Sequence, residues 1–408
     1  MIAGMVTVKV DIIIIGAGPA GLGFARSLAG TGLKVVIIER LAIDELRSPP
    51  VDGRDIALTH FSIRLLKALG AWARIPAQSI APIRQAKVLD GDSSYSLDFD
   101  NRKVVVDALG YLVSNQHIRR ALFEEVESLD DVEIITATTV DDVNTRHDEA
   151  SVMLSNGETV EAGLIVAADS RFSTTRRKMG ISAAMRDFGR VAIVCRMRHE
   201  FSHNATAFEC FQYGRTLAVL PLSGNQSSIV ITVPADMAEQ ILTMDEERFN
   251  ADVAQGFKYR LGKMALTGRR YPYPLVAVLA DRFVANRFAL IGDAAVGMHP
   301  VTAHGFNLGI RGQDTLAREI KSVLSKNADI GAFNVLDKYQ SIHSRVTRPL
   351  YFGTNGIVGL FTNDTLPARL LRKMTLRIGN HMPPVKRMIT DQLTDTDASR
   401  NPFLPFSG

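Results

Sequence analysis

The first forty residues alternate apolar and glycine-rich segments in a way that predicts a strand, a turn, a helix and a second strand. Residues 8–15 are rich in β-branched side chains and predict a strand buried on both faces. A glycine-rich turn follows over 16–21, and a helical pattern runs over 20–29. A second apolar run, 34–38, ends in Glu39 and Arg40. This order is typical of a nucleotide-binding βαβ unit.

The glycine spacing in this turn has a specific physical use. Gly16 permits the tight turn, Gly18 lets a pyrophosphate approach the backbone, and Gly21 allows the helix to pack closely on the strand. The helix N-terminus then presents unpaired N–H groups to the phosphates. Glu39 stands where a carboxylate accepts hydrogen bonds from an adenosine ribose. The unit predicts dinucleotide binding without distinguishing FAD from NAD, and no second turn of this kind follows residue 21.

Two later apolar runs also end in an acid. The run 163–169 ends in Asp169 and is followed by a polar turn. The run 287–293 ends in Gly292-Asp293, and a helix is expected to start near Gly305. Asp293 needs a hydroxyl partner, which a ribityl chain supplies, but either acid could instead cap a turn or a helix.

The segment between these two motifs has the alternation of a second sheet. Short strands are predicted over 191–194, 207–211, 217–220 and 228–233. Such a sheet can roof a pocket, and Phe208, Phe211 and Leu220 are candidates either to line that pocket or to fill a core. The two cysteines, Cys195 and Cys210, are expected in the core.

Composition limits the classes of protein that remain. The chain has 408 residues, 46% hydrophobic and 22% charged, which favours a globular protein of two domains. Two cysteines provide neither a disulfide framework nor a metal-ligand set. A net charge of +4 is too small to indicate nucleic acid. Because no secretory leader or membrane-spanning segment is recognisable, we expect a cytoplasmic protein.

Basic residues gather toward the end of the chain. Residues 340–390 hold eight Lys or Arg and one acid, Asp364. Leu366, Leu370 and Met374 share one face of a predicted helix that carries basic residues elsewhere. Such a helix can lie on the anionic inner membrane or on a partner in a biosynthetic complex, or it can pack on its own domain with the basic face in solvent. Both interpretations remain open.

Four spaced motifs resemble those of the class A flavoprotein aromatic hydroxylases, and most closely those of the ubiquinone-biosynthesis hydroxylases. Besides the glycine-rich turn, these are Asp52-Gly53-Arg54, the Asp169 turn with Arg176, and Gly292-Asp293, with Leu220-Pro221-Leu222 between them. The resemblance implies that the first unit holds the ADP half of FAD. It implies that the Asp169 turn contacts FAD and NAD(P)H, and that Gly292-Asp293 holds the flavin ribityl chain. Five residues depart from the family pattern: Ser170, Val296, Ala303, His304 and Gly312.

The motifs and the resemblance together give the candidate site residues. The cofactor-binding candidates are Gly16, Gly18, Ala20, Gly21, Glu39, Arg40, Arg54, Asn115, Asp169, Gly292, Asp293, Pro300, Gly305, Phe306 and Asn307. The catalytic candidates are His299, Pro300 and His304. A neutral imidazole can take a phenolic proton near pH 7, although either histidine could simply make loop hydrogen bonds. A helix starting near Gly305 would direct backbone N–H groups at the flavin.

The expected fold is α/β, with an FAD-binding Rossmann-like domain, an interleaved β-sheet substrate domain and C-terminal helices. The FAD domain is expected to be discontinuous over 1–75, 100–180 and 281–330, with the substrate domain over 76–99 and 181–280 and a helical region over 331–408. The resemblance implies a monooxygenase that consumes NAD(P)H and O2 and hydroxylates a lipophilic polyprenylphenol through a flavin C4a-hydroperoxide. The alternatives are a hydroxylase of a small soluble aromatic compound and a weakly active flavin-bearing subunit of a biosynthetic complex. The oligomeric state is not predicted.

Overall fold

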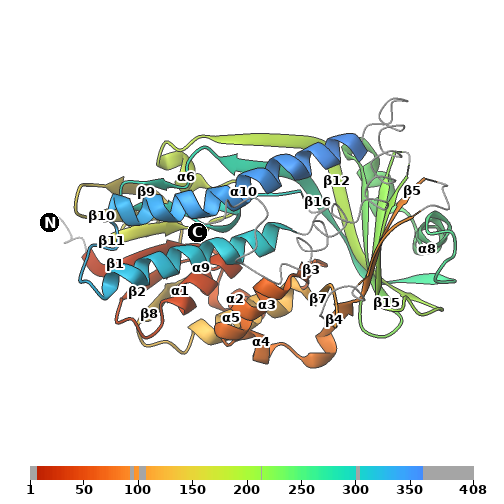
Figure 1. Ribbon diagram of the computed structural model, residues 1–408, viewed down its shortest axis with the longest axis horizontal. Coiled ribbons are helices and arrows are strands. Elements are labelled where there is room, and N and C mark those ends of the chain that lie inside the picture. Colours follow the sequence, from red (N-terminus) through yellow and green to blue (C-terminus); the bar gives the residue numbers. More distant parts are fainter. Residues whose placement is uncertain (1–6, 92–95, 101–106, 213, 300–303, 362–408) are drawn as a thin grey trace, which may run out of the picture.

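A computed structural model describes residues 7–91, 96–100, 107–212, 214–299 and 304–361. Three sheets are formed by these residues, and helices cover the sheet that contains the N-terminal strand (Figure 1). The first sheet lies at one end of the molecule and the second at the other, with the small third sheet beside them (Figure 1). The chain is therefore an α/β protein with a separate, mainly antiparallel sheet, as the sequence predicted.

The first sheet is built around the N-terminal strand. Its order is β17-β18-β11-β1-β2-β8, with β10 and β9 attached beside β11. The strands β18, β11, β1, β2 and β8 run parallel. Their bounds are β1 Thr7–Ile15, β2 Val35–Ile38, β8 Val132–Ile135, β9 Val140–Thr145, β10 Ala150–Leu154, β11 Thr159–Ala167, β17 Val284–Ala285 and β18 Phe288–Leu290.

Only the second half of β1 is buried on both faces. Ile12, Ile13 and Ile14 are fully buried between β11 and β2, whereas Val8 is 40% exposed. The prediction that the whole run 8–15 is buried was therefore wrong at its start. The reason is that β2 pairs with β1 only from Ile12 onward, so the first residues of β1 lack a neighbour on that side.

The second sheet is antiparallel except where β13 runs parallel to β5. Its order is β19-β16-β12-β15-β14-β13-β5-β6. Two long strands, β12 and β16, pair along most of their length and connect this sheet to the first (Figure 1). The bounds are β5 Gln85–Asp90, β6 Ser96–Asp100, β12 Ala183–His199, β13 Thr206–Phe211, β14 Thr216–Pro221, β15 Gln226–Pro234, β16 Met264–Ala280 and β19 Val296–Gly297.

The third sheet, β3-β7-β4, lies between the first sheet's helices and the second sheet (Figure 1). Its strands are β3 Asp55–Leu58, β4 Ile80–Ile83 and β7 Gly110–Ser114. The helices are α1 Pro19–Ser27, α2 Ile43–Arg47, α3 His60–Ala68, α4 Ala71–Arg74, α5 Asn115–Val126, α6 Thr174–Lys178, α7 Ala238–Thr243, α8 Glu246–Gly256, α9 His304–Leu324 and α10 Phe333–Phe361. Short 3-10 turns span Ala77–Ser79, Ala235–Met237 and Gly292–Ala294.

The second sheet has an outer face covered by helices and an inner face turned toward the third sheet. On the outer face, Phe208 meets Phe257 near the end of α8, with ring centroids 5.0 Å apart. Of the two alternatives for Phe208, filling a core is therefore confirmed, because alternation along β13 directs its side chain to this helical side. Cys195 and Cys210 are buried in the same outer core, as expected.

No helix of the described residues is both long enough and apolar enough to cross a bilayer. The basic helix predicted around Leu366–Met374 lies outside the described residues. The expected α9 start near Gly305 is confirmed, since α9 begins at His304.

Candidate functional site

The glycine-rich turn joins β1 to α1 with very little space around it. A Cβ at Gly16, whose φ is +108°, would lie 2.7 Å from the Ala168 carbonyl oxygen, and a Cβ at Gly21 would lie 2.0 Å from the Gly16 carbonyl oxygen. Around Gly18, by contrast, nothing lies within 4 Å of the Cβ position. The turn is therefore closed toward the protein and open on the side where a pyrophosphate would approach.

The N-terminus of α1 has donors that the chain itself does not cap. Gly18 occupies the N-cap position and provides no side-chain hydrogen bond, and Pro19 stands in the first turn. The first N–H groups of a helix have no partners within the helix, so they are available to an anion. This arrangement fits the phosphates of FAD.

Glu39 lies at the end of β2, beside the same turn. Its carboxylate accepts hydrogen bonds from the N–H groups of Ala17, at 2.6 Å, and Leu41, at 3.0 Å. Because the two oxygens of a carboxylate accept about four hydrogen bonds, acceptor sites remain for ribose hydroxyls. Arg40, the next candidate along the chain, is exposed.

The three apolar runs that end in an acid (Glu39, Asp169 and Asp293) meet at one edge of the first sheet. The close contact of Gly16 with Ala168 brings the Asp169 turn against the glycine-rich turn. A Cβ at Gly292 would lie 2.9 Å from the Ala20 Cβ, and one at Gly309 would lie 3.4 Å from the Gly292 Cα. Gly292, the first turn of α1 and the first turns of α9 are thus neighbours. The parallel strands β1 and β11 end here, which is where open α/β sheets bind ligands.

The carboxylates of Asp169 and Asp293 have different partners within the chain. One oxygen of Asp169 accepts hydrogen bonds from Thr175, and the other, Oδ1, is buried and has no hydrogen-bond partner within the described part of the chain. Asp293 forms an ion pair with Arg171, with Nη2 and Oδ2 2.9 Å apart. The sequence does not predict that Arg171 pairs with Asp293, because the two residues are 122 positions apart.

Ser170 adopts a backbone conformation that favours glycine. Its φ is +82°, in the left-handed region, at the position where the family pattern has Gly. Its carbonyl oxygen accepts a hydrogen bond from the Ser173 N–H, which closes the turn. The turn shape is therefore kept despite the substitution, at a conformational cost of about 1 kcal/mol.

Arg54 and Asn115 come together around Asp52. Arg54 Nη2 and Asn115 Nδ2 both donate to Asp52 Oδ2, at 2.6 Å and 2.7 Å. Burial alone would raise the pKa of Asp52, but the charge of Arg54 and these hydrogen bonds outweigh it and lower that pKa. Tyr273 of β16 donates to the Asp52 carbonyl oxygen, and the Arg54 guanidinium lies 5.3 Å from the Tyr273 ring centroid. This cluster fixes the Arg54 loop between the two large sheets.

A second link across the sheets is an ion pair that the sequence analysis missed. Arg196 on β12 contacts Asp55 on β3, with Nη2 and Oδ1 2.6 Å apart. The Asp55 side chain is fully buried. Asp55 follows directly after the Asp52-Gly53-Arg54 motif. No local residue pattern indicated that its partner, Arg196, lies 141 residues away on another strand.

His299 is buried and held as a neutral ring. It packs edge-on against Phe188, with ring centroids 4.9 Å apart. Burial, followed by the charges of Arg190, Arg171 and Arg186, lowers the pKa of His299 to about 4. The imidazole is therefore uncharged near pH 7 but a weak base. His304 begins α9 and is partly buried, and Pro300 lies outside the described residues.

The first turns of α9 are tied to the third sheet through Asn307. Its side-chain amide donates to the Ala57 carbonyl oxygen at 2.9 Å and accepts from the Thr59 N–H at 3.1 Å. The Asn307 side chain thus positions the start of the helix against the third sheet. Gly305 has open space at its Cβ position.

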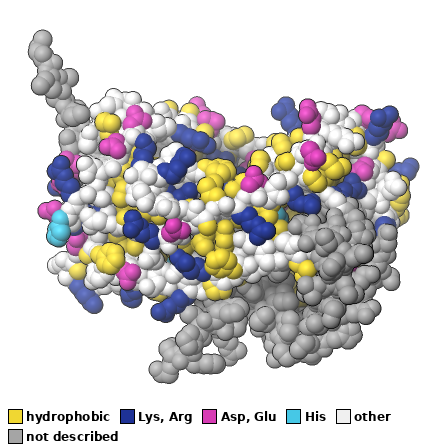
Figure 2. All heavy atoms as spheres, turned by 90° about the horizontal axis from the view of Figure 1, so that it is seen from above, with side chains coloured by type: hydrophobic (Ala, Val, Ile, Leu, Met, Phe, Trp, Pro, Cys, Tyr) yellow, Lys and Arg dark blue, Asp and Glu magenta, His cyan; other side chains and the backbone are white. Residues whose placement is uncertain are grey.

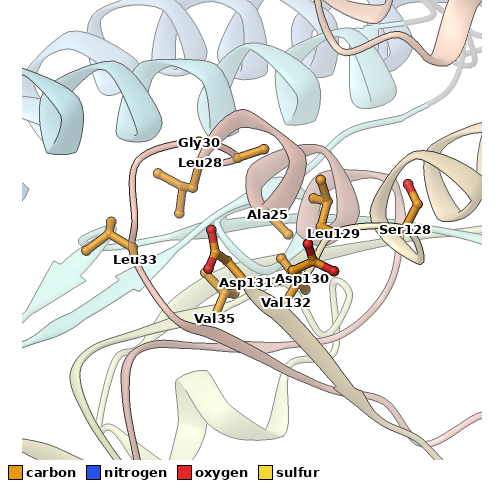
Figure 3. A pocket seen from close by; sticks show the side chains of 11 residues that line it. Ala25, Leu28, Gly30, Leu33, Val35, Ser128, Leu129, Asp130, Asp131 and Val132 are labelled. Atoms are coloured by element: carbon orange, nitrogen blue, oxygen red, sulfur yellow. The ribbon is translucent and has the colours of Figure 1, made fainter.

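A cavity of about 210 Å³ lies away from this site (Figure 3). It is formed around Leu28 and Gly30, beyond the C-terminal end of α1, and by the segment Ser128–Val132. The carboxylates of Asp130 and Asp131 stand at its wall (Figure 3). Because the glycine-rich turn is at the opposite end of α1, this cavity is not part of the candidate site.

Comparisons with known proteins agree with this geometry. The model of the FAD binding domain family matches residues 9–351. The ubiquinone hydroxylase UbiM of Neisseria meningitidis is 52% identical over 388 residues, covering 94% of this chain and 84% of that protein. The ubiquinone hydroxylase UbiL of Rhodospirillum rubrum is 33% identical over 378 residues, covering 93% and 88%.

A solved structure shows the same fold. The p-nitrophenol 4-monooxygenase PnpA of Pseudomonas putida superposes with a TM-score of 0.76 at 18% sequence identity, covering 96% of this chain and 99% of that one. The resemblance seen in the motifs is thereby confirmed over nearly the whole chain. The protein belongs to the FAD-binding family of flavin-dependent monooxygenases that includes the ubiquinone hydroxylases.

Proposed function

We propose that this enzyme hydroxylates the aromatic ring of a polyprenylphenol precursor of ubiquinone, with FAD as its cofactor, NAD(P)H as the electron donor and O2 as the source of the oxygen atom. The observation that carries the proposal is the convergence of the glycine-rich turn, the Asp169 turn, Gly292-Asp293 and the start of α9 at one sheet edge. The identity with ubiquinone hydroxylases supports the substrate class.

The residues of the chain suggest how FAD would be held. The open side of Gly18 and the uncapped N-terminus of α1 would bind the pyrophosphate, and Glu39 the adenosine ribose. Asp293, positioned by Arg171, would accept hydrogen bonds from the ribityl chain. Bound flavin supplies the capacity to activate O2 for transfer of one oxygen atom. The backbone N–H groups of the first turn of α9 would stabilise negative charge on it.

The surface offers support for a lipophilic substrate. In the view from above, hydrophobic side chains form a band bordered by lysines and arginines (Figure 2). Large hydrophobic side chains stay exposed on several elements, among them Phe172 and Met185, each at 53%, and Phe352 at 63%. We propose that this apolar and basic surface lets the enzyme collect its substrate at a membrane surface while remaining peripheral to it.

The test is product formation by the purified protein. We expect a yellow protein whose NAD(P)H oxidation is stimulated by a short-chain prenylphenol, with a product heavier by one oxygen atom in mass spectrometry. Stimulation by a small soluble phenol alone would contradict the substrate class. A yellow protein that forms no product from either would contradict the proposed activity and favour a role as a flavin-bearing subunit.

A further inference from the structure

The inner face of the second sheet contains one carboxyl group with no ion-pair or hydrogen-bond partner among the described residues. Along β13, Phe208 and Cys210 point to the outer core. Their neighbours Ala207, Glu209 and Phe211 therefore point to the inner face. Ala207 packs with residues of the third sheet, and Phe211 packs in a small cluster with Phe99. Glu209 lies between these two apolar clusters.

The strands beside β13 give Glu209 no polar neighbour directly opposite. It pairs with Ala218 on β14 and with Val88 on β5. The nearest acid on the same face is Asp90, which follows Val88 by two residues on β5 and is buried. Farther across the face, Arg196 is already paired with Asp55. A carboxyl group without a partner in apolar surroundings lowers the stability of a fold. Its presence here therefore points to a function.

Two further properties distinguish Glu209 from a core residue. It is only partly buried, although its neighbours on the inner face belong to apolar clusters. Loss of solvation raises the pKa of its carboxyl group to about 7. A carboxyl group tuned in this way can both donate and accept a proton near neutral pH.

The inner face of the second sheet and the flavin end of the FAD domain adjoin the same small sheet. Ala207 and Leu220 of the second sheet and Ala57 of β3 all pack against one small cluster of the third sheet. The Ala57 carbonyl oxygen also accepts a hydrogen bond from Asn307 in the first turns of α9. The third sheet is therefore in contact both with α9, where the flavin is expected, and with the second sheet, which carries Glu209; Figure 1 shows the third sheet next to both.

We propose that Glu209 is a catalytic residue that binds the phenolic hydroxyl group of the aromatic substrate and accepts its proton. The phenol O–H bond breaks, its electron pair stays on the substrate oxygen, and a Glu209 carboxylate oxygen takes the proton. The phenolate donates electron density to the ring, which makes the ring a better nucleophile toward the incoming oxygen atom. This inference rests on the proposed function, because it requires a phenolic substrate.

The test compares Glu209→Gln with Glu247→Gln, which changes an exposed acid on α8 of the same domain. Both variants and the wild type are purified with FAD, and NAD(P)H oxidation, product and H2O2 are measured with a short-chain prenylphenol from pH 5.5 to 9. We expect Glu209→Gln to stay yellow and form product about 100-fold more slowly, with more H2O2 per NAD(P)H. Glu247→Gln should behave as the wild type does.

The pH profile separates a proton acceptor from a structural role. Wild-type product formation should fall below about pH 7, as Glu209 becomes protonated. That decline should be absent in Glu209→Gln, whereas it would persist if Asp90 or another group caused it. A Glu209→Gln variant with wild-type rate and profile would overturn the inference. If the wild type itself forms no product, the proposed function fails instead.

Discussion

A buried histidine of α10, at its contact with α9, should make the free energy of unfolding of the protein depend on pH. His343 is 1% exposed and stacks on Tyr339 with ring centroids 5.6 Å apart. Neither of its ring nitrogens has a hydrogen-bond partner among the residues that the structure describes. Burial, with a contribution from the charge of Arg311, lowers its pKa to about 3. In the unfolded chain an imidazole titrates near pH 6.5.

The difference between the two states sets the size of the effect. Above about pH 7.5 His343 is neutral in both states. As the pH falls through 6.5, His343 binds a proton in the unfolded chain but not in the native protein. The free energy of unfolding therefore decreases. Between pH 7.5 and pH 5 this loss amounts to about 2 kcal/mol, from 1.36 kcal/mol per pH unit. The result hardly changes if the native pKa is one unit higher.

The perturbation is His343→Leu, a similar volume without a titrating group. Urea unfolding followed by far-UV circular dichroism, at pH 7.5 and pH 5 with the same excess of FAD, gives the free energy of unfolding of both proteins. We expect His343→Leu to lie within about 1 kcal/mol of the wild type at pH 7.5 and to gain about 2 kcal/mol on it at pH 5. The other buried histidines, His199 and His299, are present in both proteins, so their contributions cancel.

The outcome that would refute this reasoning is a difference between the two proteins that does not change with pH. It would mean that the native His343 ring takes up a proton as easily as the unfolded chain does. His147→Gln, at an exposed histidine, is the control and should keep the wild-type dependence on pH.

Three further predictions concern the candidate site. Ser170→Gly should raise the free energy of unfolding by about 0.5–1 kcal/mol, because φ is +82° there. Ser170→Ala keeps a Cβ and should not raise it. Urea unfolding of both variants measures the two free energies. Gly21→Ala should yield a protein that retains little FAD by absorbance at 450 nm, since the new Cβ would lie 2.0 Å from a carbonyl oxygen; full flavin content would contradict the close packing. Asp55→Asn should lower the free energy of unfolding by about 3 kcal/mol by leaving Arg196 unpaired, and an unchanged urea midpoint would show that the pair adds nothing.

Local chemistry made the glycine-rich unit predictable. Gly16, Gly18 and Gly21 act within one turn, and the strands on either side are apolar runs whose type can be judged from the residues alone. The start of α9 was predictable for the same reason. Sequence spacing also placed the Asp169 and Asp293 motifs at strand ends, which parallel pairing brings to a common edge.

What the sequence could not provide were pairings between distant segments. Arg171 with Asp293, Arg196 with Asp55, and Tyr273 with the Asp52 loop depend on how the sheets meet. Alternation along β13 divides its side chains into two sets but does not say which set faces helices. That ambiguity explains why two alternatives stayed open for Phe208 and why Glu209 was absent from the sequence-based candidates.

The long pairing of β12 with β16 has a consequence for the order of folding. Ala183 at the start of β12 pairs with Ala280 at the end of β16, so the chain leaves and rejoins the first sheet at adjacent points. The strand that completes the parallel sheet beside β11, β18, begins only at Phe288. During synthesis, the ribosome must therefore release the whole inserted sheet before the edge of the nucleotide-binding sheet can close. Until then, β10 covers the first half of this edge of β11, while residues 165–167 stay open. This is the interval in which the nascent chain is most exposed to mispairing with other strands.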